Sequence, residues 1–261
     1  MSLVNLGDCK INVRRWGDGD PLMLVHGLGA SSDLWNHQVR AFAEGFEVIA
    51  VDIRGFGRSL VLPTELDFTL YDVVDDILAV CRLLDLGRIH FVGTSMGGFI
   101  GQLLALREPH LFRSLTLCFT GCRMTIPREV VEGRMLALQE MSMDAYGALV
   151  AEQALAQPSD PFLAERLREM IAANNRETYL HYLGTVLSDF DVTERISEIQ
   201  VPSFVISGAE DRVIPPEYGE ELSERLGVPN RCFVMPGVGH VGYVENPALF
   251  NQTVLDFIDK I

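Results

Sequence analysis

Long apolar segments are absent from this chain of 261 residues. No stretch approaches the roughly 20 consecutive apolar residues that a membrane-spanning helix needs. Residues 1–8 have neither the basic start nor the apolar stretch of a secretory signal peptide. We therefore expect a soluble protein with a cytoplasmic location and no membrane partner.

Cysteine and histidine motifs that hold metals are also missing. The five cysteines are odd in number and form no C-x-x-C pair, so neither a disulfide framework nor a thiolate zinc site is expected. The chain contains no H-E-x-x-H sequence, and we expect no metal site. Cys118 and Cys232 lie in apolar runs, where we expect small core residues. Reduced thiols of this kind suit the cytoplasm.

Positive charge is scarce, because 21 Lys and Arg stand against 36 Asp and Glu and leave a net charge of −15. An acidic surface disfavours phosphate backbones and anionic lipids. We therefore discount nucleic acid as a partner. The hydrophobic fraction of 48% is enough for one sizeable core.

Short apolar runs alternate with helical patterns along the chain. The runs are continuous, as in strands buried on both faces, and occupy residues 22–25, 48–51, 89–92, 115–119, 203–206 and 231–235. Helix candidates cover residues 34–43, 70–86, 96–107, 217–226 and 247–260. This order predicts an α/β fold with a mostly parallel sheet and helices on both faces. Residues 11–16 alternate in polarity and suit an antiparallel edge hairpin.

One region, from about residue 123 to 189, has no strand pattern. Its helix candidates are residues 128–140, 143–156, 162–174 and 176–188, punctuated by Pro127, Pro158 and Pro161. We interpret residues 123–189 as a helical cap inserted into a core formed by residues 1–122 and 190–261. An independent domain is the alternative, but the strand patterns that resume afterwards favour an insertion. Ligands of open parallel sheets bind beyond the carboxyl ends of the strands, so chemistry is expected there.

A G-x-S-x-G motif, Gly93-Thr94-Ser95-Met96-Gly97, stands between a predicted strand and a predicted helix. Such a tight turn holds its serine in a strained conformation and needs glycines where side chains would clash. The turn presents the Ser95 hydroxyl outward. The helix N-terminus behind it favours developing negative charge. Ser95 is therefore the candidate nucleophile.

A serine nucleophile needs a base, and the base needs an orienting carboxylate. His240 lies in a glycine loop after the last predicted strand, and Asp211 follows the strand before it. Glu210 is the competing acid, but the turn length favours Asp211. The chain order Ser, Asp, His is the one expected with this type of turn. Four other histidines have helical or polar neighbours and are interpreted as surface residues: His37, His90, His110 and His181.

Two backbone N–H groups are predicted to form an oxyanion hole, those of Met96 and of Leu28 in the loop after residues 22–25. His26 is expected to hold this loop by hydrogen bonds. Residues 52–59 contain an Asp and two Arg, which could suggest phosphate binding. A glycine-rich turn whose side chains bond the backbone is the favoured interpretation, because the glycines do not open directly onto a helix.

Together these motifs strongly resemble the α/β-hydrolase superfamily over nearly the whole chain. The resemblance rests on residues 26–29, 52–59 and 93–98 and on Asp211 and His240, all in order. It implies an eight-stranded, mostly parallel sheet with an inserted cap. Within the superfamily, residues 93–102, 115–118 and 201–208 are most similar to the 3-oxoadipate enol-lactonase group and related small serine esterases. Ser95 differs from the Asp of haloalkane dehalogenases, and Thr94 from the Asn usual in carbon–carbon bond hydrolases.

The resemblance implies a carboxylesterase or lactonase of class EC 3.1 that acts on a small ester or lactone and needs no cofactor. We expect an apolar pocket wall from the cap, with six candidates: Met135, Met141, Met143, Phe162, Tyr179 and Tyr182. One alternative keeps the triad but cleaves a carbon–carbon or amide bond of an aromatic-degradation pathway. Another is a non-enzymatic receptor or signalling protein on the same fold. The oligomeric state is open, and a homodimer is one option.

Overall fold

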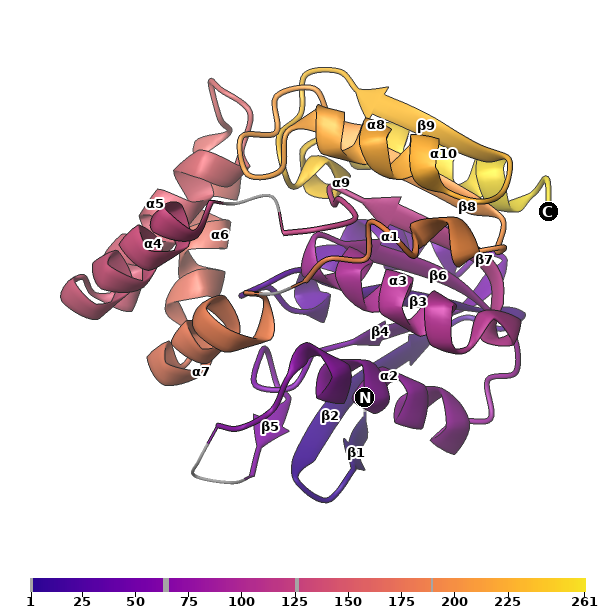
Figure 1. The fold of residues 1–261 in the computed structure, drawn as a ribbon, viewed down its shortest axis with the longest axis horizontal. Helices are drawn as coiled ribbons and strands as arrows, with labels where there is room; N and C mark the ends of the chain where they lie inside the picture. Colours follow the sequence, from indigo (N-terminus) through magenta and orange to yellow (C-terminus); the bar gives the residue numbers. More distant parts are fainter. Residues whose placement is uncertain (1, 63–65, 125–126, 189) are drawn as a thin grey trace.

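The computed structural model describes residues 2–62, 66–124, 127–188 and 190–261. One sheet runs through its centre in the order β1-β2-β4-β3-β6-β7-β8-β9 (Figure 1). These strands are β1 (Ser2–Asn5), β2 (Cys9–Trp16), β3 (Asp20–Val25), β4 (Phe46–Val51), β6 (Ile89–Thr94), β7 (Phe112–Cys118), β8 (Ser203–Gly208) and β9 (Asn230–Met235). β2 pairs antiparallel with both β1 and β4, whereas all pairs from β4 to β9 are parallel.

The predicted eight-stranded, mostly parallel sheet is thus present, and a ninth strand joins it. This strand, β5 (Leu60–Val61), pairs with Cys9 and Lys10 of β2. A strand of two residues has no periodicity that a sequence can reveal. The stretch 11–16 does form a hairpin with β1, but β1 is the edge strand because β4 covers the other side of β2.

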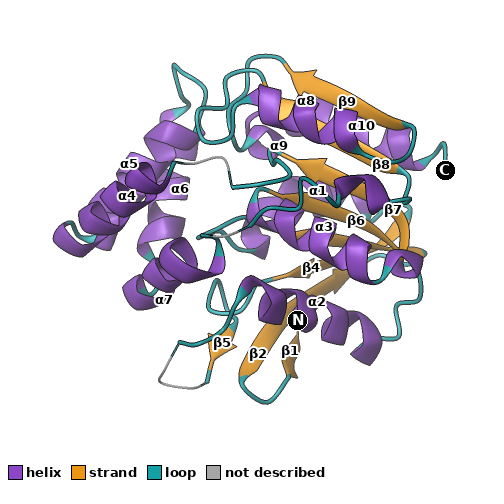
Figure 2. Ribbon diagram, viewed as in Figure 1, coloured by secondary structure: helices purple, strands orange, loops and turns teal. Residues whose placement is uncertain are grey.

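Helices cover both faces of the sheet (Figure 2). One core joins α2 (Leu70–Leu83), α3 (Met96–Arg107) and α8 (Pro216–Arg225) to strand residues such as Met23 and Val25. The other joins α1 (Asn36–Phe42) and α10 (Pro247–Ile258) to Leu22 and Leu24. Successive strand side chains point to opposite faces. The continuous apolar runs are therefore explained by a core on each side.

Most predicted helix bounds agree with the structure within a few residues. The segment predicted at 34–43 is instead a 3₁₀ turn, η1 (Ser32–Trp35), followed by α1. α2 begins where Thr69 and Asp72 form a capping box, with Thr69 N–H donating to the Asp72 carboxylate at 2.7 Å. The remaining short elements are η2 (Pro109–Leu111), η4 (Ile196–Glu198) and α9 (Gly242–Glu245).

Between β7 and β8 the chain forms α4 (Arg128–Glu140), α5 (Met143–Ala154), α6 (Pro161–Ala172), α7 (Arg176–His181) and a π-helix, η3 (Tyr182–Val186). α6 begins with Pro161 in its first turn, and Asp160 caps it by accepting the Phe162 N–H at 2.9 Å. These helices lie beyond one end of the sheet (Figure 1). Asp189, the last residue of the predicted cap, lies outside the described residues, and the division into core and cap stays a prediction.

Two predictions about burial are wrong: one expected core residue is exposed, and one expected surface residue is buried. Cys232 is exposed because β9 is an edge strand, whereas Cys118 on the central β7 is buried as expected. His90 is buried on β6, where its Nδ1 lies 2.8 Å from Ser114 Oγ of β7. Within the described ranges, no helix combines the length and apolar character needed to cross a membrane.

Candidate active site

Ser95 stands alone between the end of β6 and the start of α3. Its φ of 53° and ψ of −118° lie in a region that side chains rarely adopt, and such strain costs on the order of 1–3 kcal/mol. The surroundings hold the turn in place. The Ser95 N–H donates to Cys118 O at 2.9 Å, and the Ser95 carbonyl accepts from Thr120 Oγ1 at 3.0 Å. The strained turn predicted from the G-x-S-x-G motif is therefore observed.

The glycines around Ser95 are needed for space. A Cβ at Gly93 would collide with the carbonyl of Gly97, and a Cβ at Gly97 would collide with the carbonyl of Val25 on β3. Both obstacles are backbone atoms, which cannot move aside like the tip of a side chain. The motif thus lets α3 begin close against the sheet.

His240 and Asp211 are brought together from separate loops. Asp211 follows β8, His240 follows β9, and His240 Nδ1 lies 2.8 Å from Asp211 Oδ2. The other oxygen of Asp211 accepts the N–H groups of Val213 and Ile214, both at 2.8 Å. A carboxylate can only accept here, so Nδ1 carries a proton and donates it, which leaves Nε2 as the nitrogen that can act as a base.

Ser95 and His240 line the same cavity, whose volume is about 140 Å³. In the described contacts no hydrogen bond joins Ser95 Oγ to His240. Catalytic hydrogen bonds are often long without substrate and tighten when it binds. For scale, an apolar cavity of about 150 Å³ holds a benzene molecule. The cavity therefore suits a compact acyl or ring-sized group.

The loop after β3 lies against the nucleophile. A Cβ on Gly27 would lie 3.0 Å from Ser95 Cβ, and the adjacent Leu28 lines the cavity together with Met96. Met96 begins α3, so its N–H has no acceptor one turn earlier in the helix. Both predicted oxyanion donors thus belong to residues on the cavity wall beside Ser95. Their role in stabilising an oxyanion stays a prediction.

His26 fixes this loop as expected. Its Nε2 accepts the Ile53 N–H at 2.9 Å, so the proton resides on Nδ1, which lies 2.7 Å from the carbonyl of Gly27. The ring is completely buried, and burial lowers the pKa of His26. A neutral imidazole is the form that this pair of bonds requires.

The cavity wall contains only one of the six side chains predicted for it. Tyr179 lines the cavity. Phe162 is instead 79% exposed, and Tyr182 is buried in the core, where its hydroxyl donates to Arg54 O at 2.9 Å. The predictions for Phe162 and Tyr182 are wrong because a helix in isolation does not reveal which of its faces meets the site.

The three predicted methionines also lie off the cavity wall. Met135 packs beside Gly184 of η3, and Met143 packs against the larger core. Met141 follows α4, and its carbonyl accepts from Arg176 at 2.8 Å. The observed wall from α4, α5 and α6 instead includes Val131, Arg134, Tyr146, Gln153 and Ile171.

Comparison with known proteins agrees with this geometry. The family model described as "alpha/beta hydrolase fold" matches residues 20–168, which is more than half of the chain. The chain belongs to the α/β-hydrolase family. Among curated relatives, the candidate carbamate hydrolase RutD of Variovorax paradoxus (strain S110) is 30% identical over 257 residues, covering 94% of this chain and 93% of the relative.

Solved structures place this α/β-hydrolase among enzymes of similar size. An enol-lactonase from Burkholderia xenovorans LB400 superposes with a TM-score of 0.90 at 26% identity, covering 99% of this chain and 100% of the other. A hydrolase from Pseudomonas aeruginosa PA01 gives a TM-score of 0.89 at 28% identity, covering 98% and 97%. The comparisons support hydrolase chemistry on a small molecule.

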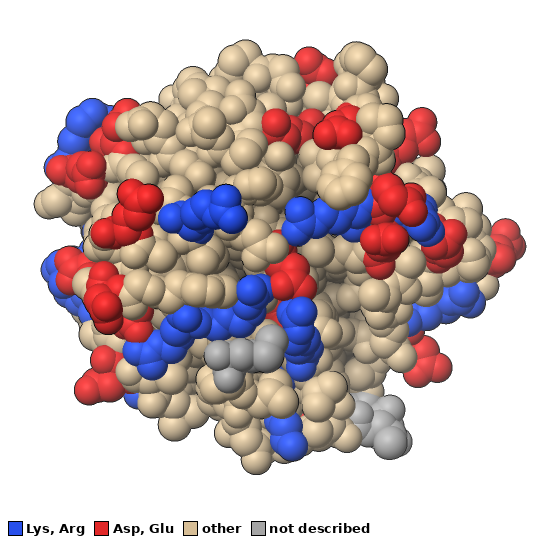
Figure 3. All heavy atoms as spheres, turned by 180° about the vertical axis from the view of Figure 1, so that it is seen from behind, with Lys and Arg blue, Asp and Glu red and all other residues tan. Residues whose placement is uncertain are grey.

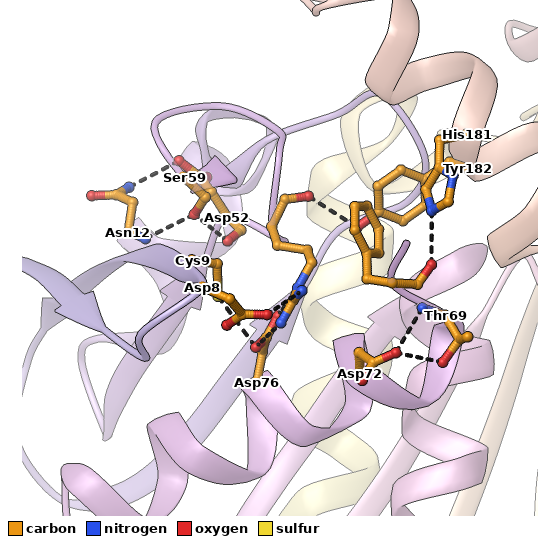
Figure 4. A network of polar contacts seen from close by, with 12 residues as sticks. Asp8, Cys9, Asn12, Asp52, Ser59, Thr69, Asp72, Asp76, His181 and Tyr182 are labelled. Atoms are coloured by element: carbon orange, nitrogen blue, oxygen red, sulfur yellow. Dashed lines mark hydrogen bonds and ion pairs between the residues drawn. The ribbon is translucent and has the colours of Figure 1, made fainter. Parts of the chain in front are cut away.

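Asp52 organises the glycine-rich turn that follows β4 in this α/β-hydrolase (Figure 4). Its oxygens accept from Asn12 Nδ2 at 2.9 Å, from the Ser32 N–H at 2.7 Å and from the Arg58 N–H at 2.9 Å. Arg54 of the same turn is buried and pairs with Asp76 of α2. The favoured interpretation of residues 52–59 as a structural turn is confirmed, because these charges are used within the protein.

Replacing Asp52 with Ala is expected to lower the free energy of unfolding by about 3 kcal/mol, since two buried donors and one part-buried N–H group lose their acceptor. Urea denaturation measures the change. Asp33→Ala is the control, because Asp33 forms half-exposed ion pairs with Arg14 and Arg58 that are worth at most about 1 kcal/mol. Equal losses in both variants would contradict the role given to Asp52.

The Asp52 carboxylate should also make the stability of the protein depend on pH. Burial alone would raise the pKa of Asp52, but the hydrogen bonds donated by the Arg58 and Ser32 N–H groups favour the carboxylate, and the pKa of Asp52 lies below its usual range. A lowered folded-state pKa stabilises the protein above the unfolded value, and this stabilisation is lost as the pH falls through the folded value. Stability of the parent should therefore fall more steeply below about pH 4 than that of Asp52→Ala.

Glu245 is a site residue that sequence reasoning missed. Its carboxylate accepts the Gly239 N–H and the Ala156 N–H, each at 2.8 Å. It thereby joins the loop of His240 to the segment after α5, and His240 N–H itself donates to Ala154 O at 2.7 Å. Burial raises the pKa of Glu245, and the two N–H donors only partly offset this rise. Nothing in the sequence signals a contact between positions 245 and 156.

Proposed function

We propose that this α/β-hydrolase is a serine hydrolase that cleaves a carboxylic ester or lactone of a small organic molecule through an acyl-enzyme on Ser95. One observation carries the proposal. The strained Ser95 shares a cavity with His240, whose Nδ1 is held by Asp211 at 2.8 Å. This combination orients an imidazole whose Nε2 can act as a base toward the Ser95 hydroxyl on the same cavity wall.

The proposed reaction follows from these groups. Nε2 of His240 takes the Ser95 proton as Oγ attacks the substrate carbonyl, and the N–H groups of Leu28 and Met96 stabilise the oxyanion. Each such donor is typically worth about 10²–10³ in rate. His240 then protonates the leaving alkoxide oxygen, which departs and leaves an ester of Ser95. Water attacks this ester by the same route and releases the acid.

The names of similar proteins support a small substrate that contains a carbonyl group. The similar structures include an enol-lactonase, and the curated relatives include candidate carbamate hydrolases. A carbamate presents the same kind of acyl carbonyl, so carbamates form the second substrate class to test. The cavity of about 140 Å³ and its largely apolar wall favour small acyl groups in both classes.

A hydrolysis screen with p-nitrophenyl acetate, p-nitrophenyl hexanoate, small lactones and p-nitrophenyl carbamates tests the proposal. We expect turnover of an ester or lactone, and labelling of Ser95 by a fluorophosphonate that mass spectrometry locates. Hydrolysis of carbamates alone would replace the proposed substrate class. If no substrate reacts and the probe leaves Ser95 unmodified, the serine-hydrolase proposal is wrong.

A further inference from the structure

The loop that carries His240 lies directly against the end of α5. A Cβ on Gly239 would lie 2.5 Å from Ala154 O and 2.8 Å from Ala156 N, so the two backbones leave no room for a side chain between them. His240 N–H donates to Ala154 O at 2.7 Å. Ala154 also lines the cavity that contains Ser95 and His240. The helix that forms part of the cavity wall is therefore bonded to the loop of the candidate base.

Glu245 of α9 closes this contact with a single carboxylate. Its Oε2 accepts the Gly239 N–H and its Oε1 accepts the Ala156 N–H, each at 2.8 Å. An amide side chain has only one acceptor oxygen and would turn an N–H group toward the second donor. Only an acidic side chain can therefore accept both bonds in this position. The two oxygens are fixed relative to each other, so this Glu245 tie keeps the segment after α5 and the loop of His240 at one spacing.

Glu245 forms no ion pair among the described residues, unlike many acidic side chains of this protein. Basic and acidic side chains lie intermixed on the face shown in Figure 3, and Glu221, for example, pairs with Arg123 at 2.8 Å. Burial raises the pKa of Glu245, the two N–H donors work against this rise, and the charges of Asp211 and Glu210 add to it. The carboxylate is therefore held by its hydrogen bonds, in a place where a neutral side chain would be easier to bury.

The loop of Asp211 is bound to the same stretch of chain. Arg212 follows Asp211 directly, and its Nη2 donates to the carbonyls of Glu152 and Leu155, the latter at 3.0 Å. The last carbonyls of a helix lack partners within it and carry partial negative charge, which a cation stabilises. The end of α5 is therefore a common support for the loops of both Asp211 and His240.

We propose that Glu245 is a positioning residue for the base His240, acting through the Glu245 tie to the end of α5. The tie holds the imidazole ring where Nδ1 meets Asp211 and Nε2 is left for Ser95. This inference rests on the proposed function for the reaction at Ser95. In the described part of the chain, Glu245 is not among the residues that line the cavity, so it acts through His240 and not on the substrate. Its loss should therefore lower kcat more than it raises KM.

Glu245→Gln is expected to lower kcat by about 10- to 100-fold and to change KM by less than about threefold. The substitution keeps the size of the side chain but removes one acceptor, and displacing a catalytic group by about 1 Å can cost about 100-fold in rate. KM changes little because the cavity wall is kept. Steady-state kinetics with the best ester or lactone of the screen measures both constants, at a temperature where circular dichroism shows that the variant is folded.

Two further variants separate the Glu245 tie from charge and from folding. Glu245→Asp keeps both acceptor oxygens on a side chain that is one methylene shorter, so it should fold and should lower kcat less than Glu245→Gln does. Glu210→Gln is the matched control, because it removes an exposed neighbouring charge and leaves the tie intact. Its kcat should stay within about threefold of the parent value. A parent kcat in both Glu245 variants, or an equal loss in Glu210→Gln, overturns the proposal.

The Nδ1 proton of His240 provides a test that needs no substrate. Its bond to Asp211 at 2.8 Å should give a low-field proton NMR signal, identified by its loss in His240→Gln. Glu245→Gln should weaken or abolish this signal, because the ring then samples positions away from Asp211, whereas Glu210→Gln should retain it. An unchanged signal in Glu245→Gln shows that the positioning role is wrong even where esters are hydrolysed. If that variant loses the signal but the parent hydrolyses no ester, the positioning role stands and the serine-hydrolase proposal fails.

Discussion

Ser95→Ala is expected to lower ester or lactone turnover by about 10⁵- to 10⁶-fold, the largest effect of any single change in this protein. The variant keeps the cavity and the oxyanion donors but loses the atom that forms the acyl-enzyme. Hydrolysis would then depend on water attacking a bound ester. Residual activity should remain above the uncatalysed rate, because substrate binding and the oxyanion donors persist. Initial rates at saturating substrate measure the loss.

The Ser95→Ala variant must fold like the parent before its loss of turnover can be attributed to the missing nucleophile. The φ of 53° is set by the backbone around position 95, so we expect the melting temperature of Ser95→Ala to stay within about 2 °C of the parent. Cys232→Ser is the matched nucleophile control, since Cys232 is an exposed thiol that could react with activated esters. If Cys232→Ser loses turnover and Ser95→Ala keeps it, Cys232 is the nucleophile and the role proposed for Ser95 is wrong.

The core fold was predictable because local patterns and tertiary structure agree there. The segments at 89–92 and 96–107 indicate a strand buried on both faces and an apolar helix, and β6 and α3 have nearly those bounds. The glycines at 93 and 97 also have a local cause, since backbone atoms occupy the space of their side chains. Motifs of this kind carry their structural reason within a few residues.

The cavity wall was less predictable because it depends on how helices face one another. Helix bounds in the cap were close, yet Phe162 points to solvent while Arg134 lines the cavity. Apolar character did not identify the residues that line the cavity, because Tyr182 and Met143 pack in or against the core instead. Glu245 shows the same limit, since its two acceptor contacts join segments separated by up to 89 positions.

Asp211→Asn is expected to lower kcat/KM by about 10⁴-fold while leaving the fold intact. The amide oxygen can still accept the N–H groups of Val213 and Ile214, which the Asp211 carboxylate holds at 2.8 Å. The amide nitrogen, however, then donates toward His240 Nδ1. His240 must accept there and carry its proton on Nε2, where it cannot take the proton of Ser95.

Glu210→Gln provides the matched control for this change. Glu210 is the adjacent acid, exposed at the same turn, and it has the same charge. If a negative charge near His240 were sufficient, the two substitutions would reduce kcat/KM alike. If the 2.8 Å bond between Asp211 Oδ2 and His240 Nδ1 sets the tautomer, Glu210→Gln should change kcat/KM by less than about threefold. A loss confined to Asp211→Asn therefore shows that Asp211 acts by fixing the position of the proton on His240. Equal losses in both variants would show that any nearby negative charge is sufficient and would contradict the proposed triad.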